Sequence, residues 1–383
     1  MAKVVCFENL SFNSHIHVGS HHYAKLFSRD FEVLWVSLPF HFLQLLKDRK
    51  SDRFADWNYN RPIRVSENLQ LLTPFTFLPY RNAPLLSSSH YLCNYRRFMP
   101  GLMRNLGRTG FGRPDIAWVT DPRHISLINA LRPKKIYYRC VDNLEHFADI
   151  PKSLLRYEKE LVRRANGVFF TSRDLMAKFG GLNDRSYYLP NGCDFDDFSG
   201  GVKDGPGEKI AAPFFRDDKI NLLYTGAVAE WFDFDFLLDV SRDDRYNIII
   251  VGPIRTTIPS GLADRKNVVF TGPFPYEMIP SFTRRANVAL IPFRVTSMTD
   301  SVNPIKLYEY CAAGVPVVAS AFKTLRELDG PFFLYGEEPP DRVIAKAFEA
   351  GRDPRFAEAC IEFAYRNSWS ARYQFIKKII TEA

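Results

Sequence analysis

Residues 303–320 read NPIKLYEYCAAGVPVVAS, and this stretch decides how the rest of the chain is interpreted. Pro304 stands where a helix can begin, because its missing N–H group is not needed in the first turn. The pattern predicts a helix over 305–313, with Gly314 as its C-terminal cap and a strand over 315–319. A helix that leads through glycine into an apolar strand is typical of an α/β domain.

The start of this predicted helix has the features of a phosphate site. Free backbone N–H groups and the helix dipole attract an anion at a helix N-terminus. Lys306 lies in the first turn, where a cation opposes the dipole unless a bound anion compensates it. Glu309 follows on nearly the same face, where its carboxylate can accept hydrogen bonds from a ribose diol. The alternative is an ordinary Lys–Glu pair on the surface of a helix.

Short β-branched runs alternate with amphipathic stretches along both halves of the chain, which predicts βαβ units and parallel sheets. Residues 199–217 interrupt this alternation with glycines, prolines and charges, so we expect a linker there. We therefore predict an N-terminal domain over 1–198 and a C-terminal domain over 218–366. Residues 367–383 are predicted to form a helix that crosses back to pack toward the first domain.

The composition is that of a globular protein with a mild positive charge. Hydrophobic residues make up 46% of the 383 residues, and the formal net charge is +8. A basic balance suits an anionic partner such as a nucleotide diphosphate or an anionic membrane surface. No apolar run of about 18 residues is present, so a membrane-spanning helix is not expected. The six cysteines form no CxxC pair, which favours free thiols in a reducing cytoplasm, and the N-terminus shows no signal-peptide pattern.

Three consecutive strands of the predicted C-terminal domain end in glycine. These are 221–224 followed by Gly226, 247–251 followed by Gly252, and 267–270 followed by Gly272. Glycine in such a turn lets the backbone approach a ligand at the carboxyl edge of the sheet. One glycine would mean little, whereas three in register predict an open, ligand-facing edge. The GxGxxG and GxxxxGK[ST] motifs are absent, so dinucleotide and P-loop sites lack their sequence support.

These stretches resemble the donor-binding domain of GT-B glycosyltransferases of the large group 1, or family 4-like, set. The resemblance lies in YTGAVAEWFDFDFLLDV, NVVFTGPFPYEMIPSF, RRANVALIPF and NPIKLYEYCAAGVPVVAS. In the first half, RANGVFFTSRDLMAKF and YYLPNGCDFDDF resemble the end of that family's N-terminal domain, and NSWSARYQFIKKII resembles its C-terminal crossover helix. The resemblance covers nearly the whole chain and implies two Rossmann-like domains that face a cleft.

The resemblance implies a hexosyltransferase that uses a nucleotide diphosphate-sugar, with UDP as the family's usual nucleotide. It implies a donor on the second domain, a glycan or lipid-linked acceptor on the first, a role in bacterial surface polysaccharide synthesis, and no bound cofactor or metal. The donor-binding residues expected from the motifs are Gly226, Gly252, Phe274, Tyr276, Arg294, Ser301, Asn303, Lys306 and Glu309.

The chain departs from the family pattern at two points. Glu309 matches the second, ribose-binding glutamate of the family's E-x7-E motif, but Ser301 stands in place of the first glutamate. The usual Arg/Lys pair after Gly226 is also absent, so Lys306 is expected to take over the charge of the diphosphate. These departures resemble a subgroup of bacterial exopolysaccharide and teichuronic-acid transferases that includes the inverting xanthan glucuronosyltransferase type. Retention or inversion at the anomeric carbon is therefore left open.

An inverting transfer needs a general base on the acceptor hydroxyl. Asp142 follows the predicted strand KKIYYRCV and is the first candidate, although an N-cap role is the alternative. Asp121, after DIAWVT, is the second candidate. In a retaining enzyme Asp142 would instead bind or orient a sugar. His15 and His17 are expected in an acceptor-binding loop, and because no carboxylate or cysteine completes their HxH pattern, no metal site is predicted.

Two stretches of the N-terminal domain suit an anionic membrane interface. Residues 38–50 and 80–113 combine Phe, Leu and Tyr with Arg and Lys. Core-facing amphipathic helices are the alternative. We expect a cytoplasmic protein bound peripherally to the inner face of the membrane, and no nucleic-acid partner, because no recognition motif is present. The alternative functions are a nucleotide-sugar epimerase of the same fold and a non-catalytic scaffold that binds a nucleotide-sugar.

Overall fold

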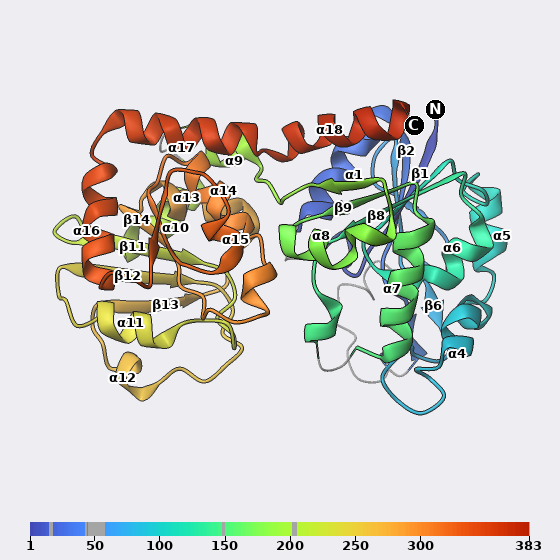
Figure 1. Cartoon of the computed structure of the whole chain (residues 1–383), viewed down its shortest axis with the longest axis horizontal. Helices are drawn as coiled ribbons and strands as arrows, with labels where there is room; N and C mark the ends of the chain where they lie inside the picture. The colour runs from blue at the N-terminus through green and yellow to red at the C-terminus, as the bar shows by residue number, and fades with distance from the viewer. Residues whose placement is uncertain (15–17, 43, 45–57, 148–149, 201–204, 383) are drawn as a thin grey trace. The chain divides into compact units, whose positions relative to one another are not determined.

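The computed structural model describes residues 1–383 except 15–17, 43, 45–57, 148–149, 201–204 and 383 (Figure 1). The chain divides into two compact units, Met1–Pro190 and Asn191–Ala383. Each unit is an α/β fold with a parallel sheet, as the alternating sequence pattern predicts.

Unit 1 is built on an eight-stranded sheet with the order β10–β9–β8–β7–β1–β2–β5–β4. Neighbouring strands are parallel except β4 and β5, which are antiparallel. The strands of this sheet are β1 (Lys3–Phe7), β2 (Glu32–Val36), β4 (Ile63–Arg64), β5 (Leu69–Leu72), β7 (Ile116–Val119), β8 (Lys135–Cys140), β9 (Gly167–Phe170) and β10 (Ser186–Tyr188). A separate parallel pair is formed by β3 (Phe40–His41) and β6 (Phe75–Thr76).

The helices of unit 1 connect and cover these strands. They are α1 (Gly19–Asp30), α4 (Ser89–Asn94), α5 (Leu102–Arg108), α6 (Ile125–Leu131), α7 (Lys152–Arg164) and α8 (Arg173–Phe179), with short 3-10 helices η1 (Tyr95–Phe98), η2 (Pro122–His124), η3 (Leu144–His146) and η4 (Gly180–Leu182). The central strands read as continuous apolar runs because both faces of the sheet are covered. Val5, Phe7, Val119 and Tyr138 are among the buried residues of the largest core cluster in this unit.

The direction of strand addition in unit 1 reverses between β1 and β7. From β1 the chain adds β2 and β5 on one side, whereas β7, β8, β9 and β10 follow on the other side. Because the central strands are parallel, their carboxyl ends meet at one edge, and open α/β sheets bind ligands at this switch point. Glu8 follows β1, Thr120 and Asp121 follow β7, and Asp142 comes shortly after β8.

Unit 2 contains a six-stranded, fully parallel sheet with the order β13–β12–β11–β14–β15–β16. Its strands are β11 (Ile220–Thr225), β12 (Tyr246–Val251), β13 (Val268–Gly272), β14 (Val288–Ile291), β15 (Val317–Ser320) and β16 (Phe332–Tyr335). The order reverses between β11 and β14, so the switch point of this sheet lies at the end of β11.

The helices of unit 2 include the one that the opening sequence predicts, α14 (Ile305–Ala312), which leads through Gly314 into β15. The others are α9 (Phe195–Phe198), α10 (Pro206–Ala211), α11 (Phe234–Val240), α12 (Ser260–Ala263), α13 (Ile279–Arg284), α15 (Lys323–Arg326), α16 (Pro340–Ala350), α17 (Pro354–Arg366) and α18 (Trp369–Glu382), with 3-10 helices η5 (Ala212–Phe214), η6 (Tyr276–Met278) and η7 (Thr299–Ser301). Gly314 has φ +72°, which is the left-handed conformation that a helix C-terminus requires.

The structure contains secondary structure in both the predicted linker and the predicted crossover helix. The contact division falls after Pro190, and the predicted linker 199–217 contains α10 and η5 in its described part. Residues 367–383 contain α18, which is grouped with unit 2. The packing of this helix toward the N-terminal domain stays a prediction.

Candidate functional site

The carboxyl edge of the unit 2 sheet is shaped by backbone. Gly226, Gly252 and Gly272 have φ values of +139°, +149° and +77°, which side chains other than glycine rarely adopt. The Gly226 N–H donates to Val251 O at 2.8 Å, and the Gly252 N–H donates to Gly272 O at 2.9 Å. A Cβ added at Gly252 would lie 2.0 Å from Gly226 O, so the two turns approach as closely as glycine allows.

Lys306 extends from the first turn of α14 to this edge. A Cβ added at Gly226 would lie 3.2 Å from Lys306 Cε and 3.4 Å from Nζ. The ammonium lies 5.5 Å from the ring centroid of Tyr224 and 5.0 Å from that of Phe293, so both rings form cation–π contacts with it. Burial lowers the pKa of Lys306 to about 8, and the nearby Glu309 carboxylate opposes that shift.

Glu309 is buried one turn further along α14, where the Tyr276 hydroxyl donates to Oε1 at 2.7 Å. Burial, and then the Glu309 carboxylate, raise the pKa of Tyr276, so this phenol keeps its proton. A second tyrosine fixes the helix to the switch point, because Tyr310 Oη accepts from Thr225 N at 2.8 Å. The structure therefore places Lys306 beside Gly226 and Tyr276 beside Glu309, and contacts of these residues with a donor stay a prediction.

Asn303 and Ser301 make contacts within the protein instead. Asn191 N donates to Asn303 Oδ1 at 2.8 Å, and Asn303 Nδ2 donates to the Tyr308 hydroxyl at 3.0 Å. The Ser301 hydroxyl donates to Met298 O at 2.9 Å and is buried. These contacts order the segment that leads into α14, and a contact of either residue with the donor stays a prediction.

Arg294 and Phe274 lie in different surroundings. Arg294 is exposed and follows β14, and its N–H donates to Trp231 O at 2.7 Å. Phe274 is half-buried and packs on Phe282, with ring centroids 4.9 Å apart. Arg294 is available to an anionic group, whereas Phe274 belongs to a small aromatic cluster.

In unit 1, Asp121 is held by its neighbour Arg123. The Arg123 Nε donates to both carboxylate oxygens, at 2.9 and 3.0 Å, and Nη2 makes a further contact with Oδ2. Burial by itself would raise the pKa of Asp121, but the Arg123 guanidinium outweighs it and, with His124, keeps that pKa below its usual value. A carboxylate that is ionised and already forked by an arginine is a weak proton acceptor.

Asp142 lies just beyond the end of β8 and is exposed, yet the surrounding protein raises the pKa of its carboxyl by desolvation while Arg139 opposes the rise. The N-cap alternative does not hold, because the side chain of Asn143 accepts from Glu145 N and caps η3. A role of Asp142 toward a bound sugar stays a prediction. His15 and His17 lie outside the described residues, as does part of the stretch 38–50.

Glu8 is a residue of this edge that the sequence analysis missed. Its side chain is 1% exposed, its carboxylate accepts from the Thr120 hydroxyl, and its Oε1 has no hydrogen-bond partner within the described part of the chain. Burial raises the pKa of Glu8 to about 8, although hydroxyls of Thr120 and Ser20 and the Arg139 charge oppose the shift. The rule that selected Asp121, a carboxylate directly after a buried strand, would also have selected Glu8 in VVCFENL.

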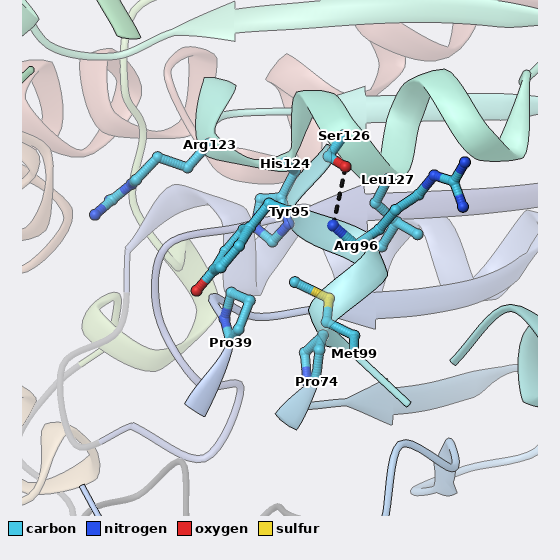
Figure 2. Close-up of a pocket in the computed structure, with 9 residues that line it drawn as sticks. All are labelled: Pro39, Pro74, Tyr95, Arg96, Met99, Arg123, His124, Ser126 and Leu127. Atoms are coloured by element: carbon cyan, nitrogen blue, oxygen red, sulfur yellow. Dashed lines mark hydrogen bonds between the residues drawn. The ribbon is translucent and has the colours of Figure 1, made fainter. Parts of the chain in front are cut away.

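A small pocket lies beside the switch point of unit 1 (Figure 2). It is lined by Pro39, Pro74, Tyr95, Arg96, Met99, Arg123, His124, Ser126 and Leu127. Figure 2 shows the Tyr95 and His124 rings beside Pro39, while the Arg96 and Arg123 side chains extend in opposite directions. His124 Nε2 is 2.9 Å from Glu8 O, so the pocket wall and Glu8 are linked. Among the described residues, no group of three or more His, Cys, Asp or Glu is arranged to hold a metal ion.

Comparisons with known proteins agree with this geometry. Residues 219–350 match the family described as "Glycosyl transferases group 1". A protein of Bacillus subtilis (strain 168), named provisionally as a teichuronic acid biosynthesis glycosyltransferase, is 22% identical over 234 residues. That match covers 58% of this chain and 58% of the length of the relative.

Solved structures resemble the whole chain at low sequence identity. Sucrose-phosphate synthase from Thermosynechococcus elongatus has a TM-score of 0.70 at 14% identity, covering 100% of this chain and 99% of its own. HepE from Anabaena, in complex with UDP and glucose, has a TM-score of 0.67 at 14% identity and full coverage of both chains. These neighbours are GT-B glycosyltransferases. The chain therefore has a GT-B fold, and its residues 219–350 are similar to the group 1 glycosyltransferase family.

Proposed function

We propose that the protein is a hexosyltransferase that moves a sugar from a UDP-sugar to a glycan or lipid-linked acceptor in bacterial surface polysaccharide synthesis. The name of the Bacillus subtilis relative supports the polysaccharide role. The complexes of HepE with UDP and with UDP-glucose support the choice of donor. In this proposal unit 2 binds the donor and unit 1 binds the acceptor.

The observation that carries the proposal is the position of Lys306 and Glu309 on the first turns of α14, against the Gly226 turn. Backbone N–H groups of the helix start and the Lys306 ammonium suit a diphosphate. Glu309, held by Tyr276, can accept from a ribose diol. As the sugar–phosphate bond breaks, negative charge grows on the leaving diphosphate, and a cation already in place stabilises it.

We propose further donor contacts for residues around this centre. Arg294 is exposed beside it and suits a phosphate or an anionic sugar, whereas Ser301 and Asn303 border the start of α14. Asp142, at the carboxyl edge of the other sheet, is proposed to orient the acceptor sugar. His15 and His17 are proposed to lie in the acceptor loop, as the sequence predicts.

Peripheral attachment to the inner face of the membrane is part of the proposal. In unit 1, Phe77, Leu78 and Leu85 are 56%, 43% and 84% exposed, and Arg81 and Arg97 are exposed near them in the chain. Exposed apolar side chains with arginines suit an anionic lipid surface. Within the described residues, the structure contains no helix long and apolar enough to cross a membrane.

The first test is a thermal-shift panel of nucleotide-sugars, since a ligand that binds the folded state raises apparent stability. The donor found in this way is then used to measure release of its nucleotide by Lys306→Ala and Glu309→Ala variants. We expect losses of about 100-fold or more in kcat/KM, because Lys306 stabilises the charge that grows on the leaving diphosphate and Glu309 holds the ribose in place. Lys346→Ala is the matched control, since Lys346 is an exposed lysine of α16 that pairs with Glu338.

Activity within threefold of wild type in both folded variants would disprove the assigned donor site. Product analysis without an acceptor distinguishes transfer from epimerisation, because an epimerase releases an altered nucleotide-sugar. Binding of a nucleotide-sugar without turnover, under any acceptor supplied, would identify a scaffold.

A further inference from the structure

Glu8 stands at the point of unit 1 where an α/β sheet is expected to bind its ligand. It follows β1, and its carboxylate accepts from Thr120, which follows β7, so the residue bridges the two strands between which the sheet order reverses. A buried polar atom without a hydrogen-bond partner is uncommon in native structures and asks for an explanation. Glu8 Oε1 is such an atom within the described part of the chain.

Three carboxylates lie along this edge, and their surroundings separate their properties. Asp121 is ionised and forms an ion pair with Arg123. Both of its carboxylate oxygens therefore already accept strong hydrogen bonds. Asp142 is exposed and, in the described part of the chain, has no buried, unused oxygen, although desolvation raises the pKa of its carboxyl as well and Arg139 opposes that rise. Glu8 is buried with one oxygen unused. When environments push the pKa values of neighbouring carboxyls apart, the group whose pKa lies near neutrality is the one suited to exchange a proton.

We propose that Glu8 is the proton acceptor for the acceptor hydroxyl in a single displacement that inverts the anomeric carbon. The proposal rests on the glycosyltransferase function proposed above. The hydroxyl proton passes to Glu8 Oε1, the hydroxyl oxygen forms a bond to the anomeric carbon, and the bond between that carbon and the phosphate oxygen breaks. The leaving nucleoside diphosphate takes the bonding electron pair. To reach the hydroxyl, the Glu8 side chain turns toward the edge and breaks its hydrogen bond with Thr120.

The groups around Glu8 explain why it is uncharged at rest and still able to accept a proton. The charged and titratable groups that act on its carboxyl or touch its backbone are Cys6 of β1, Asp121 after β7, Arg139 of β8 and His124 of η2. Burial raises the pKa of Glu8 to about 8, and Arg139 limits the rise. The reactive, ionised form of Glu8 therefore increases as the pH rises toward 8.

The experiment compares Glu8→Gln with Glu158→Gln, using release of nucleoside diphosphate from the nucleotide-sugar that the thermal-shift panel selects. Glu158 is a matched control, because it is also 1% exposed in unit 1 and accepts from the Tyr138 hydroxyl at 2.8 Å. Water is the acceptor in one arm and azide in the other, since azide attacks without losing a proton. We expect Glu8→Gln to lose hydrolysis by about 10²- to 10⁴-fold, the usual contribution of a general base.

In the azide arm, Glu8→Gln should form a glycosyl azide at a rate near that of wild type, with inverted configuration in the NMR spectrum. Donor affinity measured by calorimetry should be unchanged. Glu158→Gln should hydrolyse within threefold of wild type. As a measurement that needs no variant, wild-type kcat at saturating donor should rise between pH 6 and 8 as Glu8 ionises, and loss of the Lys306 charge should oppose the rise above pH 8.

Hydrolysis by Glu8→Gln within threefold of wild type would overturn the proposal, and so would a lack of azide rescue, a retained configuration, or a kcat that is flat between pH 6 and 8. If Asp142→Asn shows the loss and the rescue instead, Asp142 is the base. Wild-type protein that turns over no nucleotide-sugar would overturn the glycosyltransferase function itself, and the calorimetric donor measurement separates that failure from a failure at Glu8.

Discussion

The carboxyl edges of the two sheets use different chemistry. In unit 2 the edge is formed mainly by backbone, with glycines at positive φ directly after β11 and β12 and at the end of β13, together with one lysine from α14. In unit 1 the edge carries the side chains of Glu8, Asp121 and Asp142. A diphosphate is recognised by N–H groups and one cation, which any close turn can supply. A hydroxyl that must lose its proton needs a carboxylate, and the protein has to set the basicity of that carboxylate.

The difference explains why one edge was easy to find in the sequence and the other was not. Glycine at a turn is visible in the sequence because close approach of backbone leaves few other choices. A carboxylate after a strand is equally visible, but its pKa depends on neighbours that come from distant parts of the chain.

The largest effect should come from adding one methyl group to the unit 2 edge. In Gly252→Ala the new Cβ would lie 2.0 Å from Gly226 O and 2.6 Å from Gly226 C. Because both atoms are backbone, the turn has to move, and we expect a loss of about 4 kcal/mol or more in the free energy of unfolding, together with loss of donor binding. Chemical denaturation and calorimetry with UDP measure the two effects.

Gly272→Ala is the matched control, since a Cβ there meets no atom within 4 Å and the cost is limited to the φ of +77°. We expect about 1 kcal/mol for that change. Equal losses for the two variants would show that close packing of backbone is not what shapes this edge.

The next largest loss of stability should come from breaking the ion pair between Asp121 and Arg123. Asp121→Ala leaves a guanidinium that is only partly exposed without its partner, so we expect a loss of about 2 kcal/mol in the free energy of unfolding. Because the pKa of Asp121 is held below its usual value, the contribution of the pair is complete near neutral pH and disappears as the pH falls through the acidic range. Urea denaturation at pH 7 and at pH 3 measures the difference.

Asp353 and Arg355 provide the comparison, because they repeat the same Asp–Arg fork two residues apart on an exposed helix start. Asp353→Ala should destabilise less than Asp121→Ala. If Asp353→Ala destabilised the protein more than Asp121→Ala, burial would not explain the stability contribution of the Asp121–Arg123 pair.

Donor affinity should depend on pH through Lys306. The pKa of Lys306 is lowered to about 8 by burial, so the ammonium that attracts a diphosphate is present below pH 8 and is lost above it. Between pH 7 and pH 9 we expect about tenfold weaker binding of UDP, which corresponds to about 1.4 kcal/mol. In the Lys306→Arg variant the side chain stays charged throughout this range. The affinity of that variant for UDP should therefore not change between pH 7 and pH 9. A parallel decrease in both proteins would assign the effect to another group.

The smallest effect is a gain in stability. Because the fold lowers the pKa of Lys306 below that of the unfolded chain, the charged ammonium destabilises the empty protein at neutral pH. Lys306→Met should therefore raise the free energy of unfolding by about 1 kcal/mol at pH 7, and the gain should fade as the pH rises above 8. The same variant should lose the thermal shift caused by UDP. A loss of stability would mean that the ammonium is satisfied in the empty protein.

Much of the unit 2 edge could be predicted from the sequence. The helix that starts after Pro304, the glycine turns and the side chains of Lys306 and Glu309 are local features, and their spacing places them at one edge once a parallel sheet is assumed. The hydrogen bonds of Asn303 to Asn191 and of Tyr310 to Thr225 were not predicted, because they join residues more than 80 positions apart. These contacts make Asn303 part of the architecture around the site.

The sequence by itself determined an α/β chain with two parallel sheets and a phosphate-ready helix start, because apolar periodicity, glycine and proline act locally. Only the tertiary structure decided that Glu8 is buried, that Asp121 is paired with Arg123 and that Asp142 is exposed. Glu8 and Asp121 both follow neighbouring strands, yet Arg123 donates two hydrogen bonds to Asp121, whereas Glu8 is buried with one oxygen unused. The physical reason is that the free energy of a charge depends on all the groups around it, and folding is what brings those groups together.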